Sequence, residues 1–227
     1  CYRDEDLRAD RQPEFTQIDI EASFISQQEV MQLTETMLCN LFEKFKGATL
    51  GEFPILSWDD AMRDYGSDRP DLRNPLKLVD IADLMQGVEF KIFNGPANDV
   101  EGRVVAMRAP GGATLSRKVI DGYTEFVGRY GAKGLAYIKV NDLGAGVDGL
   151  QSPILKFLPA DVIQEVLGRV GAQDGDVVFF GADKKGVVND SIGALRNELG
   201  EALGLVAEGY APCWVVDWPM FAASRDG

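Results

Sequence analysis

Two short segments near the start of the chain carry side chains that could bind a nucleotide and an amino acid. Arg3 and Glu5 alternate in the first segment, and Phe15, Gln17 and Asp19 alternate in the second. A guanidinium group can donate two parallel hydrogen bonds to phosphate oxygens. An aromatic ring offers a stacking surface to a base, and a carboxylate attracts an ammonium group. These residue types therefore predict one surface that recognises a phosphate, a base and an ammonium group.

The density of charge supports this interpretation, although a simpler one exists. Eight of the twelve residues from Arg3 to Glu14 are charged, with both signs mixed. A solvated hairpin loop would show such a composition, with surface ion pairs that contribute about 0–1 kcal/mol each. Against it, the arginines fall on and just after a segment with strand character, which would orient them.

The elements that must position these side chains are predicted to be two antiparallel strands, Tyr2–Glu5 and Phe15–Phe24. In the second strand the apolar positions alternate with the polar ones. Ile18, Ile20 and Ala22 are expected to face a core. The candidate site residues are then expected to share the exposed face. The connecting residues 6–11 are predicted to form a mobile loop.

Two helices are expected to follow. Ser26 and Glu29 form a capping-box pattern, an apolar stripe continues to Phe45, and Gly47 is placed as a C-cap. We expect this helix to pack on the apolar back of the two strands. A shorter helix is predicted from Ser57 to Gly66. The turn-rich residues 65–78, with two prolines, are predicted to be a linker and a domain boundary.

Beyond residue 78 the sequence alternates between strand and helix patterns. The expected strands are Val88–Phe93, Arg103–Arg108, Leu135–Val140, Asp176–Phe180 and Cys213–Trp218. The expected helices are Ser116–Tyr130, Ala160–Val170 and an amphipathic segment from Val188 to Leu203. The segment FFGADKKG could place an anion at a helix N-terminus, but a solvated helix start explains Lys184 and Lys185 equally well.

Composition excludes several classes of function. The chain has 227 residues and no histidine, so it holds no Ser–His or Cys–His pair and no His-ligated metal. The three cysteines are widely spaced and match neither a disulfide framework nor a metal-binding pattern. A net charge of −13 argues against a general nucleic-acid-coating surface. No apolar stretch is long enough to span a bilayer and no secretory signal is visible, so a cytoplasmic location, no DNA binding and no membrane association are expected.

The segment CYRDEDLRADRQPEFTQID resembles motif 2 of class II aminoacyl-tRNA synthetases. Its sequence is similar in particular to that of the bacterial aspartyl-tRNA synthetases. The similarity continues through FPILSWDDAMRDYGSDRPDLRNPLKLVDIADL. The segments VEFKIFNGPAND, GRVVAMRAPGGATLSRK, YGAKGLAYIKVND, GLQSPILKFL and GAQDGDVVFFGADKK resemble the insertion domain of that family, often called the GAD domain. Finally, APCWVVDWPMF looks like the strand that returns to the catalytic core.

The resemblance implies an α+β fold: part of the class II antiparallel catalytic sheet with an inserted α/β GAD domain. Residues 1–75 would belong to the catalytic core, residues 76–208 to the GAD domain and residues 209–227 to the return strand. It also implies a ligase that activates L-aspartate with ATP to aspartyl-adenylate and transfers it to tRNA.

The resemblance assigns roles residue by residue. Arg3 would be catalytic, because it would contact the α-phosphate and orient the substrate carboxylate. The implied ATP-binding residues are Arg3, Asp4, Glu5, Arg11, Gln12 and Phe15, and the implied aspartate-binding residues are Arg3, Gln17 and Asp19. No metal ligand is assigned in this chain, although Mg²⁺ is expected in the full-length enzyme.

Departures from the family pattern limit what this chain is expected to do alone. Motif 1, the motif 3 arginine and the anticodon-reading OB-fold are not found in it. We therefore expect an internal fragment that is inactive alone, from a parent enzyme that is a homodimer. The partners implied are ATP, L-aspartate and aspartate tRNA, and the sequence leaves open whether asparagine tRNA is also charged. The alternative is a non-catalytic GAD-type module that binds tRNA or a partner, since that domain type also occurs in a subunit of the tRNA-dependent amidotransferase.

Overall fold

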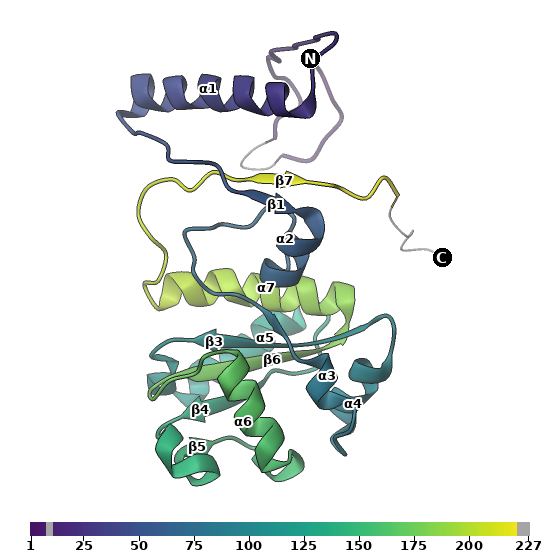
Figure 1. Cartoon of the computed structure of the whole chain (residues 1–227), viewed down its shortest axis with the longest axis vertical. Coiled ribbons are helices and arrows are strands. Elements are labelled where there is room, and N and C mark those ends of the chain that lie inside the picture. Colours follow the sequence, from purple (N-terminus) through teal and green to yellow (C-terminus); the bar gives the residue numbers. More distant parts are fainter. Residues whose placement is uncertain (8–10, 222–227) are drawn as a thin grey trace. The chain divides into compact units, whose positions relative to one another are not determined.

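Residues 1–7 and 11–221 are described in the computed structural model of the chain (Figure 1). Their contacts divide the chain into two units, Cys1–Thr49 and Leu50–Gly227. This division differs from the proposed domain limits at residues 75 and 208, which follow family domains rather than contacts and stay predictions.

The first unit contains one long helix, α1 (Gln27–Lys46), and its ends confirm the prediction. The Ser26 hydroxyl accepts a hydrogen bond from the backbone N–H of Glu29 at 3.3 Å, and the Glu29 carboxylate accepts one from the Ser26 backbone N–H at 2.6 Å. Gly47 ends the helix with φ of 63°. The expected packing of its apolar stripe is wrong for five of the seven residues, because Val30, Leu33, Met37, Leu41 and Phe45 are exposed. Only Leu38 and Phe42 of the stripe are partly buried.

The two strands predicted in this unit are also wrong as regular elements. The segments pair in antiparallel fashion at an isolated bridge, Tyr2↔Glu14, and no strand is assigned within the described residues 11–25. Ile18 and Ile20 are exposed instead of facing a core. The physical reason is that a strand needs neighbours. Residues 13–15 pair only with residues 1–3 among the described residues, and an isolated two-stranded hairpin is only marginally stable in water.

The second unit is built on a five-stranded antiparallel sheet in the order β2–β3–β6–β4–β5 (Figure 1). Its strands are β2 (Val79–Asp80), β3 (Gly102–Ala109), β4 (Ala136–Val140), β5 (Leu150–Gln151) and β6 (Val177–Lys184). The two long central strands pair from Gly102↔Lys184 to Ala109↔Val177. Strands β3, β4 and β6 confirm predicted strands, and β6 continues four residues beyond its predicted end at Phe180.

Helices cover both faces of this sheet. On one face α5 (Arg117–Gly128) and α7 (Lys185–Ala202) pack against Val177 and Phe179 of β6. On the other face α3 (Ala82–Met85), α4 (Lys91–Asn98) and α6 (Ala160–Arg169) pack against Val178 and Phe180. Successive side chains of β6 point to opposite faces of the sheet, so this strand contributes residues to both cores. The predicted α+β class is confirmed, and so are the predicted helices that became α5, α6 and α7.

The remaining elements are short. Three 3₁₀ turns lie at Gly112–Thr114, Leu143–Gly149 and Leu155–Phe157. A separate parallel pair joins β1 (Ile55–Ser57) to β7 (Trp214–Val216), with Leu56 opposite Val215. The predicted strand Cys213–Trp218 is therefore confirmed in its central part, whereas β1 was not predicted.

The predicted strand Val88–Phe93 is wrong, because its end forms the first turn of α4. Phe93 and Ala97 are buried and stand four residues apart, so a helix places both side chains in the same core. Phe90 contacts the Phe93 ring edge-on at a centroid distance of 5.0 Å and stacks on Phe157. A strand would have placed Phe90 and Phe93 on opposite faces.

The turn-rich residues 65–78 are held in place by a buried arginine, Arg196, so they do not form a free linker. They follow α2 (Trp58–Tyr65), which begins at Ser57 and ends at Gly66 as predicted. Arg196 of α7 donates to the backbone carbonyls of Leu76 at 2.6 Å, Asp71 at 2.8 Å and Asn74 at 2.5 Å. Burial lowers the pKa of its guanidinium, and the nearby Tyr65 and Asp71 oppose that effect.

Within the described residues, none of the helices combines the length and the apolar character needed to cross a membrane.

Candidate functional site: a hollow lined by arginine and aromatic side chains

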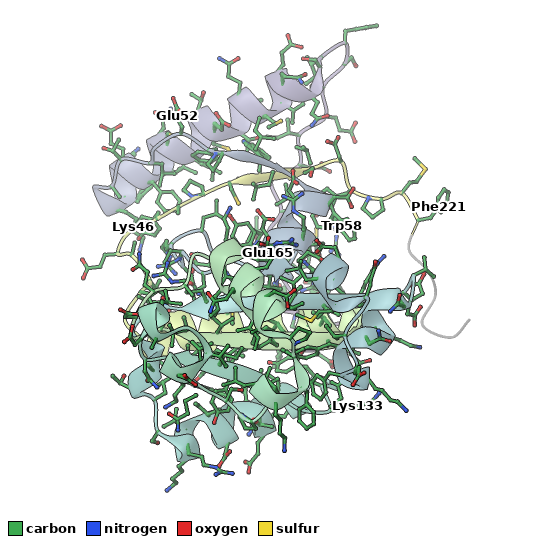
Figure 2. All side chains as sticks on the ribbon, turned by 60° about the horizontal axis from the view of Figure 1, so that its bottom comes forward. Lys46, Glu52, Trp58, Lys133, Glu165 and Phe221 are labelled. Atoms are coloured by element: carbon green, nitrogen blue, oxygen red, sulfur yellow. The ribbon has the colours of Figure 1, made fainter. Side chains whose placement is uncertain are left out.

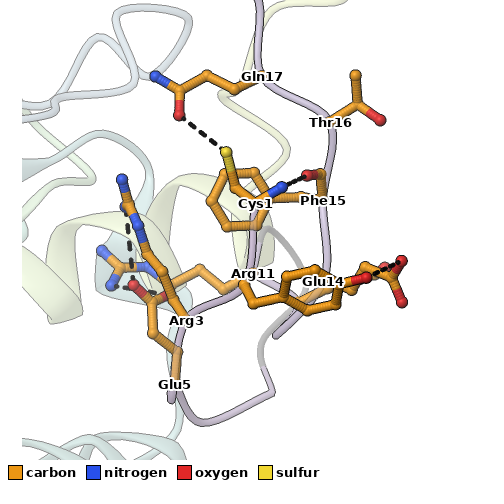
Figure 3. Close-up of a pocket in the computed structure, with 10 residues that line it drawn as sticks. Cys1, Arg3, Glu5, Arg11, Glu14, Phe15, Thr16 and Gln17 are labelled. Carbon is orange, nitrogen blue, oxygen red and sulfur yellow. Dashed lines mark hydrogen bonds and ion pairs between the residues drawn. The ribbon is translucent and has the colours of Figure 1, made fainter.

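A hollow of about 1150 Å³ lies between the two segments at the start of the first unit (Figure 3). All of its lining residues belong to the first 17 positions of the chain. They are Cys1, Tyr2, Arg3, Glu5, Arg11, Gln12, Glu14, Phe15, Thr16 and Gln17. Six of the eight predicted site residues are among them.

Backbone hydrogen bonds bring the two segments together. The N–H of Arg3 donates to the Pro13 carbonyl at 2.8 Å, and the N–H of Phe15 donates to the Cys1 carbonyl at 3.1 Å. At the bridge between them the Tyr2 hydroxyl donates to Glu14 Oε1 at 3.3 Å. The predicted antiparallel approach of the segments is therefore present at this point, which is where Arg3 and Phe15 are needed.

One carboxylate serves two guanidinium groups in this hollow. Glu5 Oε1 lies 3.9 Å from Nη1 of Arg3, and Glu5 Oε2 lies 3.6 Å from Nη1 of Arg11 (Figure 3). Both arginine side chains are more than half exposed, and exposed ion pairs contribute only about 0–1 kcal/mol each. Phosphate oxygens could therefore replace the carboxylate at either arginine at little cost.

The aromatic ring lies directly beside one of these cations. The guanidinium carbon of Arg3 is 5.2 Å from the centre of the Phe15 ring, within the range of a cation–π contact. Phe15 is half-buried and its neighbours in sequence are exposed. A base that stacks on this ring would hold its attached phosphates within reach of the arginines.

Two predicted residues do not join the hollow. Asp4 and Asp19 are exposed and are not among the lining residues. Gln17 does join it, and its side-chain carbonyl accepts a hydrogen bond from Cys1 Sγ at 3.5 Å. Asp19 comes two residues later, where the described backbone is no longer paired. Of the loop predicted over the site, residues 8–10 lie outside the described residues.

Four lining residues were missed from the sequence: Cys1, Tyr2, Glu14 and Thr16. The available signal was the pairing itself, because Tyr2 lies opposite Glu14 once residues 3 and 13 are hydrogen-bonded. Strict alternation excluded them. It fails here since the pairing is limited to a bridge and both sides of each segment remain accessible.

The described residues contain no group of three or more Cys, Asp or Glu side chains placed to hold a metal ion. In the hollow, Glu5 is engaged by two arginines and Glu14 by Tyr2.

Two guanidinium groups, a shared carboxylate and an accessible aromatic ring are the side chains that suit phosphate oxygens and a base. The chain belongs to the class II tRNA synthetases of the D, K and N group, because the model of that family matches residues 1–225. Members of this family are ligases that use ATP to join an amino acid to tRNA. The α+β fold agrees with that membership.

Proposed function

We propose that this chain is part of an aspartate–tRNA ligase, which activates L-aspartate with ATP and transfers it to aspartate tRNA. The observation that carries the nucleotide half of this proposal is the meeting of Arg3, Glu5, Arg11 and Phe15 around one hollow. The amino-acid sequence of residues 1–19 supports aspartate as the substrate, because it resembles the bacterial aspartyl-tRNA synthetases.

The reaction assigned to the site needs positioning more than proton transfer. The aspartate carboxylate attacks the α-phosphorus of ATP, a new P–O bond forms, and the bond to pyrophosphate breaks. Aspartyl-adenylate and pyrophosphate are the products. Charge builds on the phosphoryl oxygens during this step, and fixed guanidinium groups stabilise it. The absence of histidine is compatible with such a mechanism, because no side-chain base is required.

In this proposal Phe15 stacks on adenine and Arg3 contacts the α-phosphate. Their separation of 5.2 Å supports that assignment, since the α-phosphate is the phosphate closest to the nucleoside. Arg11 and Gln12 would lie along the outer phosphates, with Asp4 and Glu5 near the nucleotide. Gln17 and Asp19 would receive the α-ammonium group of aspartate.

The amino acid, the homodimer and the Mg²⁺ ion belong to the proposal as well. The Mg²⁺ would bring its positive charge to the ATP phosphates, and no residue of this chain is assigned as its ligand. Charging of asparagine tRNA is a second substrate choice within the same activity.

The rival proposal is a GAD-type module that binds tRNA or a protein without chemistry. The second unit favours it to the extent that it has two hydrophobic cores of its own.

Aspartate-dependent ATP–pyrophosphate exchange by the ligase encoded by this gene tests the site. Arg3→Ala is expected to lower kcat/KM by about 100-fold or more, as the loss of one transition-state donor does in other enzymes. Arg117→Ala is the matched control, because that side chain is exposed in the second unit, and it should leave exchange unchanged. Exchange within about twofold of the unmodified ligase in Arg3→Ala would overturn the motif 2 assignment.

Two further arms test specificity and the isolated chain. Asparagine and lysine should not support exchange; if either does so in place of aspartate, the proposed substrate is wrong. The 227-residue chain alone should show no exchange. Exchange by this chain would contradict the proposal that it is inactive alone.

A further inference from the structure

A second cavity, of about 540 Å³, is lined only by residues of the second unit. It lies between α4, the end of β6, the first turns of α7 and the residues just before β4. Its walls are mainly apolar and include Phe90, Ile92, Leu135, Phe180, Val187 and Ile192. Cavities of this size and character are typical of ligand-binding sites.

One side of the cavity is an unpaired strand edge. Strand β4 begins at Ala136, which lies opposite Phe180, whereas β6 continues to Lys184. From Gly181 onward β6 therefore has β3 on one side and no strand on the other among the described residues. An unpaired strand edge is a template for one more strand.

The alternation of the ladder shows which backbone groups face this edge. The backbone carbonyl of Asp176, just before β6, accepts a hydrogen bond from the N–H of Val140 at the end of β4. The backbone N–H of Lys185, just after β6, donates to the backbone carbonyl of Glu101 on the β3 side. Even-numbered residues of β6 therefore direct N–H and C=O toward β4. Ala182 is one of them, it lines the cavity, and it has no backbone hydrogen bond on that side within the described residues.

Charged groups lie at the rim. Lys133, labelled in Figure 2, pairs with Asp183 at 3.6 Å between Nζ and Oδ2. Lys91 also lines the cavity, is exposed, and makes no ion pair with another described residue. On a chain with a net charge of −13, this lysine is a local positive charge that favours an acidic group on the ligand.

We propose that this cavity binds an extended peptide segment of a partner protein. One residue of the peptide pairs with the N–H and C=O of Ala182, its large apolar side chain enters the cavity, and a following acidic residue lies near Lys91. The backbone pair supplies orientation and the apolar side chain supplies affinity, as in other cases of strand addition. This role is separate from the proposed ligase chemistry.

Titration of the ¹⁵N-labelled chain with acetyl-Val-Leu-Val-Glu-amide, followed by NMR, tests the proposal. The Ala182 amide signal is expected to shift in a saturable manner. The same peptide methylated on the leucine nitrogen should bind about tenfold more weakly or worse, because it cannot donate to the Ala182 carbonyl.

Two variants locate the binding site. Ile92 is 61% exposed and lines the cavity, so Ile92→Glu should fold and should weaken binding by about tenfold. Val100 is 80% exposed and is not among the lining residues, so Val100→Glu should bind as the unmodified chain does. Lys91→Ala should weaken binding by about two- to fivefold.

Three results would overturn the proposal. They are the absence of a saturable shift, equal binding of the methylated peptide, and equal binding by Ile92→Glu. A shift of the same signals by adenosine or by an apolar dye, without one by the peptide, would instead assign the cavity to a small molecule.

Discussion

At the residue scale, Arg196 is a buried cation that holds a turn-rich segment of the second unit. It is 1% exposed, and its guanidinium carbon lies 4.8 Å from the centre of the Tyr65 ring. Its donors satisfy three backbone carbonyls of residues 71–76, and its own carbonyl accepts from the Asn74 side chain at 2.8 Å. A buried cation is tolerated when hydrogen bonds replace its water, and here three of its partners are carbonyls of a segment that has little regular structure.

We predict that Arg196→Met lowers the free energy of unfolding of the second unit by about 3 kcal/mol or more, because it leaves several buried carbonyls without donors. Arg69→Met is the matched control, since Arg69 is exposed in the same turn-rich segment, and it should change stability by less than about 0.5 kcal/mol. Urea unfolding followed by tryptophan fluorescence measures both. Equal stability of the two variants would show that the guanidinium does not hold the segment.

At the element scale, the end of α2 is fitted closely to α7. Gly66 has φ of +66°, and a Cβ built on it would lie 2.7 Å from the backbone oxygen of Asn189. Gly204, just beyond α7, has nearly the same backbone with φ of +64°, but a Cβ there would have nothing within 4 Å. The two glycines therefore separate backbone strain from steric contact.

We predict that Gly204→Ala costs about 1 kcal/mol from the left-handed backbone alone. Gly66→Ala should cost about 3 kcal/mol, because helix backbone must also shift to admit the methyl group. Thermal and urea unfolding of both variants would measure the difference. Similar losses in the two variants would mean that α2 and α7 can separate without penalty.

At the scale of the whole molecule, the first unit exposes most of the apolar stripe of α1. Leu33 is 55% exposed and Phe45 is 70% exposed, and Val30, Met37 and Leu41 belong to the same face. Contiguous exposed apolar surface on this scale promotes association. Among the residues that the structure describes, the two hydrophobic core clusters lie in the second unit, and α1 contributes to neither.

We predict that the chain associates with itself as its concentration rises, at a salt concentration that screens its negative charge. Sedimentation velocity should show an increasing average mass for the unmodified chain and for Val100→Glu. The double variant Leu33→Glu with Phe45→Glu should stay monomeric over the same range. A monomeric unmodified chain would contradict this reading of the exposed face.

Local signals in the sequence determined several elements correctly. The caps at Ser26, Ser57 and Gly66, and the helical stripes of α5, α6 and α7, depend on residues within one or two turns of each other. The same is true of the approach of Arg3 to Phe15, because a short loop joins their segments. The sequence alone therefore predicted α1, α2, α5, α6 and α7 and six of the ten residues around the hollow.

Tertiary structure decided what depends on distant partners. Residues 91–98 became a helix because Phe93 and Ala97 share one core, whereas Ile18 and Ile20 stayed exposed because no described strand or helix covers them. Residues 65–78 were predicted to be a linker, because the residue that donates hydrogen bonds to them, Arg196, lies more than 100 positions later in the chain. Strand pairing and buried polar contacts join residues far apart in the chain, and periodicity within a short window does not contain that information.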